Sequence, residues 1–370
     1  MSKSKVFMTD LRTKPGNSLL DKLKKLMVTA GFDSLDLTGK FTAIKIHFGE
    51  PGNLAYIRSN YAAAVVEMVQ RNRGLAFLTD SNTLYHGSRS NAVDHLTAAM
   101  KNGFNPLSCG CPVIIADGLK GSEFREIRIE QMYCRTAKIG SAIADADVII
   151  SMTHFKGHEM TGFGGVLKNI GMGSGSCSGK LEMHSASKPR NVTKNCTGCG
   201  ICILNCSQHA IAFNSERRAV IDYDRCIGCG QCVAMCRFNA MQVIWDESAD
   251  TATMKIAEYA LAVLKDKPQF HLSFVMSVSP NCDCYPNNDV PIIQDIGILA
   301  SMDPVALDRA CVDLVNAAPA MPGSVLDQPG FSSDQDKFGF IHPNTHWKLG
   351  LDYAETIGLG TQNYELIPIK

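Results

Sequence analysis

Two runs of four cysteines constrain this chain more than any other feature of its sequence. Both runs have the spacing C-x2-C-x2-C-x3-C, and the second begins 30 residues after the first. The first run is Cys196, Cys199, Cys202 and Cys206, and the second is Cys226, Cys229, Cys232 and Cys236. A [4Fe–4S] cluster takes four thiolates, and this spacing is typical of its ligands. The sequence therefore predicts two [4Fe–4S] clusters and an electron-carrying role.

The spacing also suggests how the eight ligands divide between the clusters. In bacterial two-cluster ferredoxins, the fourth cysteine of each run binds the other cluster. The first cluster is expected to have the ligands Cys196, Cys199, Cys202 and Cys236. The second is expected to have the ligands Cys226, Cys229, Cys232 and Cys206. Paired disulfides or two zinc sites are the alternatives, but zinc ligands usually come as two separated pairs.

The residue after each fourth cysteine departs from the ferredoxin pattern. Proline usually stands there, whereas this chain has Ser207 and Arg237. A positive charge from Arg237 beside a cluster is expected to favour the reduced form of that cluster, which carries more negative charge.

The cysteine-rich segment, residues 188–246, is a small part of a chain of 370 residues. On both sides of it, short apolar runs alternate with amphipathic stretches, which indicates a mostly parallel sheet covered by helices on both faces. We predict an α/β body formed by residues 1–187 and 247–370. A bacterial-type two-cluster ferredoxin domain (α+β) is expected as an insertion at residues 188–246. Three consecutive domains are the alternative.

The individual elements of the body follow from the spacing of apolar residues. The predicted strands are Val6–Met8, Phe41–Ile46, Leu75–Leu78, Pro112–Ala116, Asp147–Ser151, Phe270–Val278 and Tyr364–Ile369. The predicted helices are Ser18–Ala30, Ser59–Gln70, Asn91–Asn102, Thr136–Ala144, Thr251–Leu264, Asp303–Val315 and Trp347–Ile357. Asp303 is expected to be the N-cap of its helix, with Pro304 at the first helical position.

Composition excludes several classes of partner. Lysine plus arginine equals aspartate plus glutamate and no long charge run occurs, so we expect no nucleic-acid partner. No run of about 18 apolar residues exists, so we expect no membrane span. The chain has 15 cysteines and no apolar N-terminal segment, which fits a reducing compartment better than disulfide formation in a secreted protein. We predict a cytoplasmic protein.

Polar loops follow several of the predicted strands. If these strands are parallel, their ends meet at one edge of the sheet, where α/β proteins place binding sites. Imidazole and carboxylate groups there would suit an additional divalent metal, and a lysine would suit a small anionic substrate. Ordinary packing of these side chains is the alternative. The candidate residues are His47, Glu50, Asp80, His154, His158, Lys168, Cys282 and Cys284.

The region around Lys168 carries a further prediction. Lys168 and Asn169 follow a glycine-rich turn, whose N–H groups together with the lysine would cradle a phosphate or a carboxylate. Lys168 is followed by asparagine rather than serine or threonine, so a P-loop is excluded. The glycine-rich segment Gly171–Gly175 is expected to be a flexible lid or a linker toward the cysteine-rich domain.

Two C-x-C pairs lie outside the cluster runs. They are Cys282 with Cys284, and Cys109 with Cys111. Cys282 and Cys284 are candidates for a third metal site, for redox thiols, or for ligands to a metal bound with the substrate. The alternative for such cysteines is a role as small buried hydrophobic residues.

Four stretches of the chain resemble the DUF362 family of uncharacterised iron–sulfur proteins. They are Ile44–Asn53, Thr79–Leu96, Thr153–Gly173 and Met302–Val315. The likeness covers nearly the whole chain, including the cysteine-rich insertion. It implies a single body with an inserted two-cluster module, and it implies no particular reaction.

We predict an iron–sulfur electron-transfer protein, namely an oxidoreductase. It would pass electrons between a soluble redox partner protein and a substrate or metal in the α/β body. The alternative is a non-catalytic ferredoxin-like carrier or maturation factor that docks a partner protein. An enzyme should have a ligand site near the histidine loops, whereas a carrier should have an exposed apolar patch beside the clusters.

The cluster prediction implies a stoichiometry that can be measured. Anaerobically purified protein is expected to contain about eight iron and about eight sulfide per chain, because each [4Fe–4S] cluster holds four of each. A Cys199→Ser variant is expected to lose about half of the iron, while Cys109→Ser keeps it. Zinc in place of iron, or equal iron in the two variants, would contradict the assignment.

Overall fold

The centre of the molecule is an eight-stranded sheet with the strand order β16-β1-β15-β14-β7-β2-β3-β4. This computed structural model describes residues 3–85, 87–185, 188–206, 208–226, 228 and 230–369. The strands of the sheet are β1 (Ser4–Thr9), β2 (Phe41–Ile46), β3 (Leu75–Asp80), β4 (Val113–Ile115), β7 (Val148–His154), β14 (Gln269–Val275), β15 (Gly297–Ser301) and β16 (Tyr364–Pro368).

Most strands of this sheet run in the same direction. β14, β7, β2, β3 and β4 form a continuous parallel series, and β1 pairs in parallel with β16. β15 is antiparallel to both of its neighbours, β1 and β14. All seven residues of β7 are buried, as expected when helices cover both faces of a parallel sheet. The predicted α/β body with a mostly parallel sheet is confirmed.

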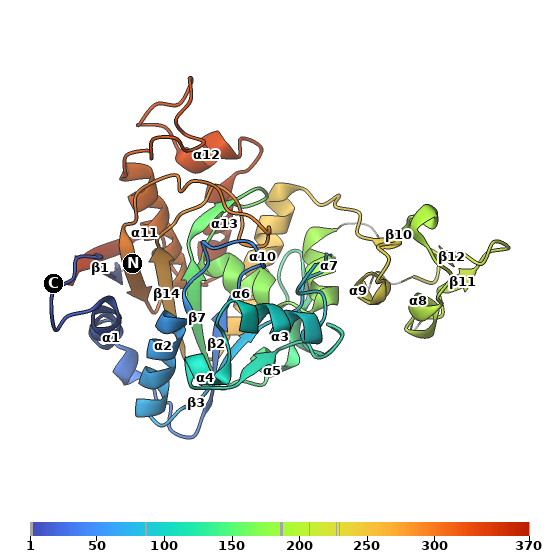
Figure 1. Cartoon of the computed structure of the whole chain (residues 1–370), viewed down its shortest axis with the longest axis horizontal. Coiled ribbons are helices and arrows are strands. Elements are labelled where there is room, and N and C mark those ends of the chain that lie inside the picture. The colour runs from blue at the N-terminus through green and yellow to red at the C-terminus, as the bar shows by residue number, and fades with distance from the viewer. Residues whose placement is uncertain are drawn as a thin grey trace.

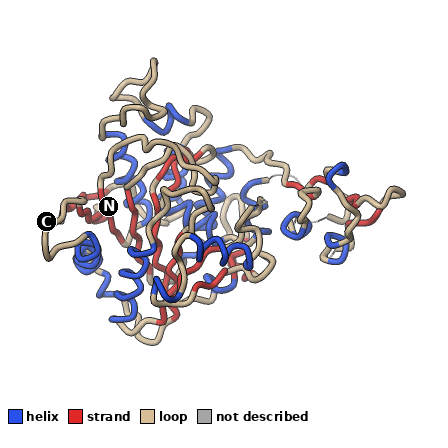
Figure 2. Tube along the Cα trace, in the orientation of Figure 1, coloured by secondary structure: helices blue, strands red, loops and turns tan. Residues whose placement is uncertain are grey.

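Helices cover the sheet in two layers, each with its own hydrophobic core (Figure 1). Figure 2 shows the strands gathered between them. One layer contains α1 (Leu19–Thr29), α2 (Ser59–Arg71) and α3 (Ala92–Lys101). The other contains α6 (Val166–Ser174), α10 (Ala249–Leu264), α11 (Pro304–Ala317) and α13 (Trp347–Thr356). The apolar faces of these helices therefore account for the burial of both sides of the sheet.

Shorter elements connect these layers. They are the helices α4 (Pro106–Cys109), α5 (Ser141–Ala144), α7 (Cys177–His184) and α12 (Lys337–Ile341), the 3-10 turns Phe32–Ser34 and Thr193–Asn195, and the paired strands β5 (Phe124–Arg128) with β6 (Thr136–Gly140) and β8 (Lys156–His158) with β9 (Gly162–Gly164). Within the described ranges, no helix is both long enough and apolar enough to cross a membrane.

The predicted strands and helices of the body agree with the observed ones within a few residues, with one exception. Asp303 is confirmed as an N-cap, because its carboxylate accepts hydrogen bonds from the N–H groups of Val305 and Ala306 at 2.9 and 3.0 Å. The antiparallel strand β15 was not predicted. Its five residues are all buried, so its sequence, Gly297–Ser301, has no alternation to reveal it.

The exception is Thr136–Ala144, for which the prediction of a helix is wrong. Thr136–Gly140 is strand β6, and only the last four residues form the short helix α5. β6 is held by antiparallel pairing with β5 along its whole length. This pairing depends on a partner strand elsewhere in the chain, and such tertiary contacts override local helix periodicity.

The glycine-rich segment after Lys168 is not a flexible lid or linker, so that prediction is also wrong. Gly171 and Gly173 lie within α6, which packs closely against α10. A Cβ on Gly171 would lie 2.1 Å from the carbonyl oxygen of Ile256, and one on Gly173 would lie 2.4 Å from Nζ of Lys45. The glycines are therefore required by close packing, because any larger residue would push the helix away from its neighbours.

The described part of residues 188–246 adds no strand to the main sheet, which takes strands from both sides of this segment. They contain two small antiparallel sheets, β10 (Arg190–Asn191) with β13 (Met241–Gln242) and β11 (Ile211–Phe213) with β12 (Ala219–Ile221), and two short helices, α8 (Ile201–Leu204) and α9 (Gln231–Met235). Each helix follows a left-handed glycine, Gly200 or Gly230. Figure 1 shows this segment projecting from the body beside α7. We call it the cysteine module.

The packing of α6 gives a test of the fold. Gly171→Ala is expected to lower the free energy of unfolding by about 1–3 kcal/mol, because the new methyl group meets backbone rather than a movable side chain. This loss should exceed the ~1 kcal/mol that alanine gains over glycine in a helix. Chemical denaturation measures the change, with Val93→Ala on the exposed face of α3 as the control. A stabilised Gly171→Ala variant would contradict the close packing.

Candidate functional site

The cysteines of the module gather as the spacing predicted for the first cluster. Cys196, Cys199, Cys202 and Cys236 line one cavity. The described cysteines are all free of disulfides, including Cys206, Cys226 and Cys232 of the second predicted set. Cys229, the remaining predicted ligand, and Ser207 lie outside the described residues. Arg237 is exposed directly after Cys236. The two ligand sets themselves remain predictions.

Backbone N–H groups point at several of these sulfur atoms. Ala219 N–H donates to Sγ of Cys196 at 3.4 Å, Ala210 N–H to Cys206 at 3.3 Å, and Ala240 N–H to Cys236 at 3.2 Å. Such hydrogen bonds stabilise the negative charge of a thiolate and of a cluster bound to it. Cysteines that form no disulfide and whose sulfurs accept backbone hydrogen bonds around one cavity fit a [4Fe–4S] cluster. Such a cluster binds one thiolate at each iron atom, whereas a single metal ion would bind several thiolates.

A larger cavity of about 590 Å³ lies where the parallel strands end. β2, β3, β7 and β14 are parallel neighbours, so the loops after them meet at this edge of the sheet. Seven of the eight residues predicted outside the module line the cavity: His47, Glu50, Asp80, His158, Lys168, Cys282 and Cys284. His154 lies behind the lining. We call this space the strand-end cavity.

Several side chains that line the strand-end cavity were not predicted. They are Lys45, Arg89, Lys156, Lys180, His184 and Trp245. Lys45 and Lys156 lie on strands and are almost fully buried, so a single lysine inside an apolar strand pattern could have identified them. Lys180 and His184 are four residues apart on α7, which places them on one helix face. Trp245 had no sequence pattern to mark it.

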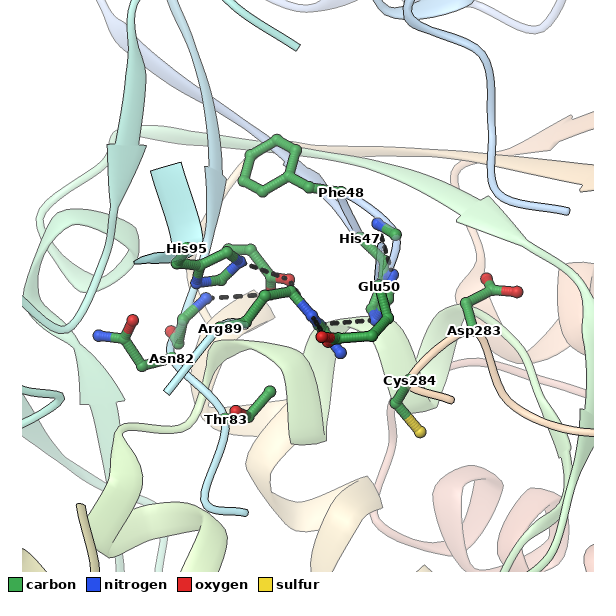
Figure 3. A network of polar contacts seen from close by, with 12 residues as sticks. His47, Phe48, Glu50, Asn82, Thr83, Arg89, His95, Asp283 and Cys284 are labelled. Atoms are coloured by element: carbon green, nitrogen blue, oxygen red, sulfur yellow. Dashed lines mark hydrogen bonds and ion pairs between the residues drawn. The ribbon is translucent and has the colours of Figure 1, made fainter. Parts of the chain in front are cut away.

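The predicted acidic site residues, Glu50 and Asp80, form ion pairs with buried cations. Lys45 pairs with Asp80 at 2.9 Å. Arg89 pairs with Glu50 at 2.7 Å (Figure 3). Burial alone would raise the pKa of Asp80, but the charge of Lys45 and those of His95, His47 and Arg89 together hold it below its ordinary value. Burial lowers the pKa of Lys45 against the opposing effect of Asp80. Both carboxylates therefore serve charge pairing within the protein.

Two of the predicted histidines have both ring nitrogens occupied. His47 faces two donors, Arg89 Nη1 at 2.8 Å and the N–H of Gly49 at 3.0 Å. His154 faces two acceptors, the carboxylate of Asp283 at 2.8 Å and the carbonyl of Met276 at 2.8 Å. Within the described part of the chain, no three His, Cys, Asp or Glu side chains are arranged to hold one metal ion. The additional divalent metal remains a prediction.

His154 anchors the loop that carries Cys282 and Cys284. Asp283 lies between the two cysteines, is fully buried, and pairs with His154 and with Lys156 at 3.4 Å. Burial alone would raise the pKa of Asp283, but the neighbouring His154 and Lys156 outweigh it and lower that pKa. Asn53 also holds the loop, donating to the carbonyl of Tyr285 at 3.3 Å. The two sulfurs are therefore presented by a firmly held turn.

Cys282 has surroundings that favour a thiolate. Lys168 Nζ donates to its sulfur at 3.4 Å, and Cys284 and His158 line the same cavity. Nδ1 of His158 accepts from the N–H of Thr161 at 3.2 Å, so its other nitrogen carries the ring proton. The adjacent Cys284, with Lys168 and His158, outweighs burial and lowers the pKa of Cys282, while the pKa of Cys284 is raised.

The predicted phosphate cradle at Lys168 and Asn169 is not formed by the helix start. The first N–H groups of α6, from Val166 and Leu167, donate to the carboxylate of Asp308 at 2.6 and 3.0 Å. Asn169 binds Lys45 and Thr153. The buried Asp308 thus occupies the position that an anion would take. Lys168 instead contributes its ammonium group to the strand-end cavity.

Helix α7 connects the cysteine module with the strand-end cavity. Cys177 and Leu181 of α7 belong to the same apolar cluster as Cys232 of the module. Lys180 and His184 of the same helix line the cavity. The His184 ring packs edge-on against Trp245, near the end of the module, with 4.9 Å between the ring centres. Among the described residues, α7 therefore lies between Cys232 and the cavity.

Comparison with known proteins identifies a family but no activity. A family model described as "Domain of unknown function (DUF362)" matches residues 42–313. No curated protein matches the chain. Among solved structures, the chain is similar to the lactate racemase apoprotein from Thermoanaerobacterium thermosaccharolyticum, with 11% identity and a TM-score of 0.37. That match covers 74% of this chain and 51% of the other, so the chain spans about half of its length. Likeness of this degree carries no functional argument.

The cationic partner of Cys282 gives a test of the site. Lys168→Gln removes a positive charge beside the thiolate, so the pKa of Cys282 should rise, by about 1–3 units for loss of an adjacent opposite charge. The pH midpoint of Cys282 alkylation by iodoacetamide, followed by mass spectrometry, should move upward accordingly. Lys168→Arg should keep the midpoint low, and the exposed Lys120→Gln should not change it. An unmoved midpoint in Lys168→Gln would contradict the pairing.

Proposed function

Since the chain belongs to the DUF362 family, whose description assigns no activity, we propose from its site that it is an iron–sulfur oxidoreductase. It passes electrons between a soluble redox partner protein and a small anionic substrate in the strand-end cavity. Two [4Fe–4S] clusters, held by the eight cysteines of the module, supply one-electron transfer when bound. The residues of the body bind the substrate and exclude bulk water.

The observation that carries this proposal is the position of the cavity beside the module. A carrier has no need of a cavity of about 590 Å³ in its body, whereas a small-molecule site commonly has this size. Residues of α7 contact both the second cysteine run and the cavity. An electron donor and a binding space thus lie on adjoining faces of one helix.

Charge favours an anion as the substrate. Among the described lining residues, the cations Lys45, Arg89, Lys156, Lys168 and Lys180 outnumber the carboxylates Glu50, Asp80 and Glu159. Burial lowers the pKa values of Lys45 and Lys180, so both lysines would gain from a bound negative charge. Lys180 has no carboxylate within ion-pair distance among the described residues, so it is the cation that a bound anion would engage most directly.

The second candidate function, a non-catalytic carrier or maturation factor, has one observation in its favour. Apolar side chains are exposed on the module, namely Leu204, Phe213, Val220 and Phe238. Exposed apolar groups beside redox centres are suited to docking a partner protein. An oxidoreductase also needs such a surface for its electron donor, so this observation is shared by both functions and the cavity distinguishes them.

Blocking the cavity tests the proposed function. Protein reduced anaerobically with dithionite is freed of excess reductant and mixed with the small anions pyruvate, nitrite or glutathione disulfide, and reoxidation is followed by cluster absorbance. Met160→Trp places a large ring in the cavity and is expected to slow reoxidation by the accepted anion at least tenfold, with unchanged iron content. Met132→Trp, on the exposed surface, is the matched control. Equal rates in the two variants would favour the carrier.

A further inference from the structure

We propose that Cys282 and Cys284 form a redox-active dithiol that converts the one-electron supply of the module into two-electron chemistry in the strand-end cavity. The proposal rests on the proposed function for its source of electrons. It assigns to this pair a reversible disulfide, with Cys282 as the nucleophilic thiolate and Cys284 as the resolving thiol.

The local geometry permits the two sulfurs to join. The N–H of Tyr285 donates to the carbonyl of Cys282 at 3.2 Å, which closes a tight turn with Cys284 inside it. The two side chains both line the strand-end cavity. A disulfide across this turn needs no movement of the loop ends, which are held through Asp283 and Asn53.

The surroundings of the pair match the needs of thiol–disulfide chemistry. The attacking thiol must be a thiolate, and Lys168 stabilises that form of Cys282 from 3.4 Å. The resolving thiol must keep a proton until the second step, and the adjacent Cys282 together with burial raises the pKa of Cys284. His158 lines the same cavity and lowers the pKa of Cys282. The sulfur of Cys282 is therefore surrounded by the ammonium group of Lys168, the imidazole of His158 and the thiol of Cys284.

A matched pair in the same chain lacks these features. Cys109 and Cys111 have the same C-x-C spacing and are buried. Burial raises the pKa of Cys111 to about 12, and Cys109 contacts Ser108 and the carbonyl of Gly103 rather than a cation. Identical spacing therefore occurs once with a stabilised thiolate and once without it. This difference singles out Cys282 and Cys284 rather than C-x-C pairs in general.

The electron balance of the proposed step is complete. The Cys282–Cys284 disulfide accepts two electrons and one proton, the S–S bond breaks, and the products are the Cys282 thiolate and the Cys284 thiol. Clusters held by the module would supply these electrons one at a time, and a soluble one-electron donor would reduce the clusters again. In the opposite half-reaction, the Cys282 thiolate attacks one sulfur of an anionic disulfide such as glutathione disulfide; a mixed disulfide forms and one thiolate leaves. The Cys284 sulfur then attacks Cys282 of the mixed disulfide, the second thiol leaves with the proton of Cys284, and the Cys282–Cys284 bond closes again.

The path for these electrons crosses α7. Cys232, in the second cysteine run, packs with Cys177 and Leu181 of this helix, while Lys180 and His184 line the cavity beside the pair. A helix with its side chains is about 10 Å across, so the separation is on the order of one helix diameter. His184 and Cys282 line the same cavity.

The first experiment asks whether the disulfide forms. Holoprotein is treated anaerobically with glutathione disulfide, its free thiols are alkylated, and tryptic peptides are analysed by mass spectrometry. The fragment of residues 266–309 contains only Cys282 and Cys284, and the fragment of residues 102–120 contains only Cys109 and Cys111. We expect an internal disulfide in the first fragment and two alkylated thiols in the second. Two free thiols in both fragments, or a disulfide in both, would overturn the proposal.

The second experiment asks whether the electrons arrive through the clusters. Oxidised protein receives reduced methyl viologen, and loss of the disulfide is timed in wild type and in Cys226→Ser, a variant of the second predicted cluster. We expect at least tenfold slower reduction in the variant, and no change in Met132→Trp. Equal rates of disulfide reduction in wild type and Cys226→Ser would overturn the proposal that the module reduces the dithiol. The iron content of the wild-type protein would still support the proposed function. Wild-type protein without iron would instead remove the proposed function and leave the disulfide result standing.

Discussion

The parallel alignment of β14, β7, β2 and β3 is the constraint on which the rest of the site depends. Parallel strands end at a common edge, so residues separated by more than two hundred positions meet there. His47 follows β2, Asp80 ends β3, and the Cys282 loop follows β14. Without this alignment none of these side chains would share a cavity.

Buried charge is the cost of this arrangement, and the structure compensates it by pairing. Lys45 and Asp80 are nearly inaccessible, as are Arg89 and Glu50, and each pair meets within hydrogen-bond distance. Removing one member of such a pair destabilises the protein by far more than the pair's net contribution to the free energy of unfolding. The reason is that the other charge is left buried without a partner. The same pairing fixes His154 on Asp283 and so controls how the thiols of the loop are presented. Stability and site geometry therefore rest on the same contacts.

The two segments whose structure was predicted incorrectly from the sequence were misjudged for the same physical reason. The glycines of Gly171–Gly175 have a composition typical of flexible linkers, yet Gly171 is required because the backbone of Ile256 occupies the space of its Cβ. Thr136–Gly140 has helical periodicity, yet it pairs with β5. In both cases the deciding partner lies far away in the sequence, where local propensity contains no information about it. The contact of His154 with Asp283 likewise joins residues that are 129 positions apart.

The sequence by itself determined the cysteine spacing, the alternation of strands and helices, the N-cap at Asp303 and seven of the residues that line the strand-end cavity. These features are local, because ligand spacing, apolar periodicity and capping depend on neighbouring residues. Only the tertiary structure decided the roles of those residues: Glu50 and Asp80 are partners of buried cations, His154 anchors a loop, and Cys282 faces Lys168. The difference arises because charge pairing and thiolate stabilisation depend on distances of a few ångströms between distant parts of the chain.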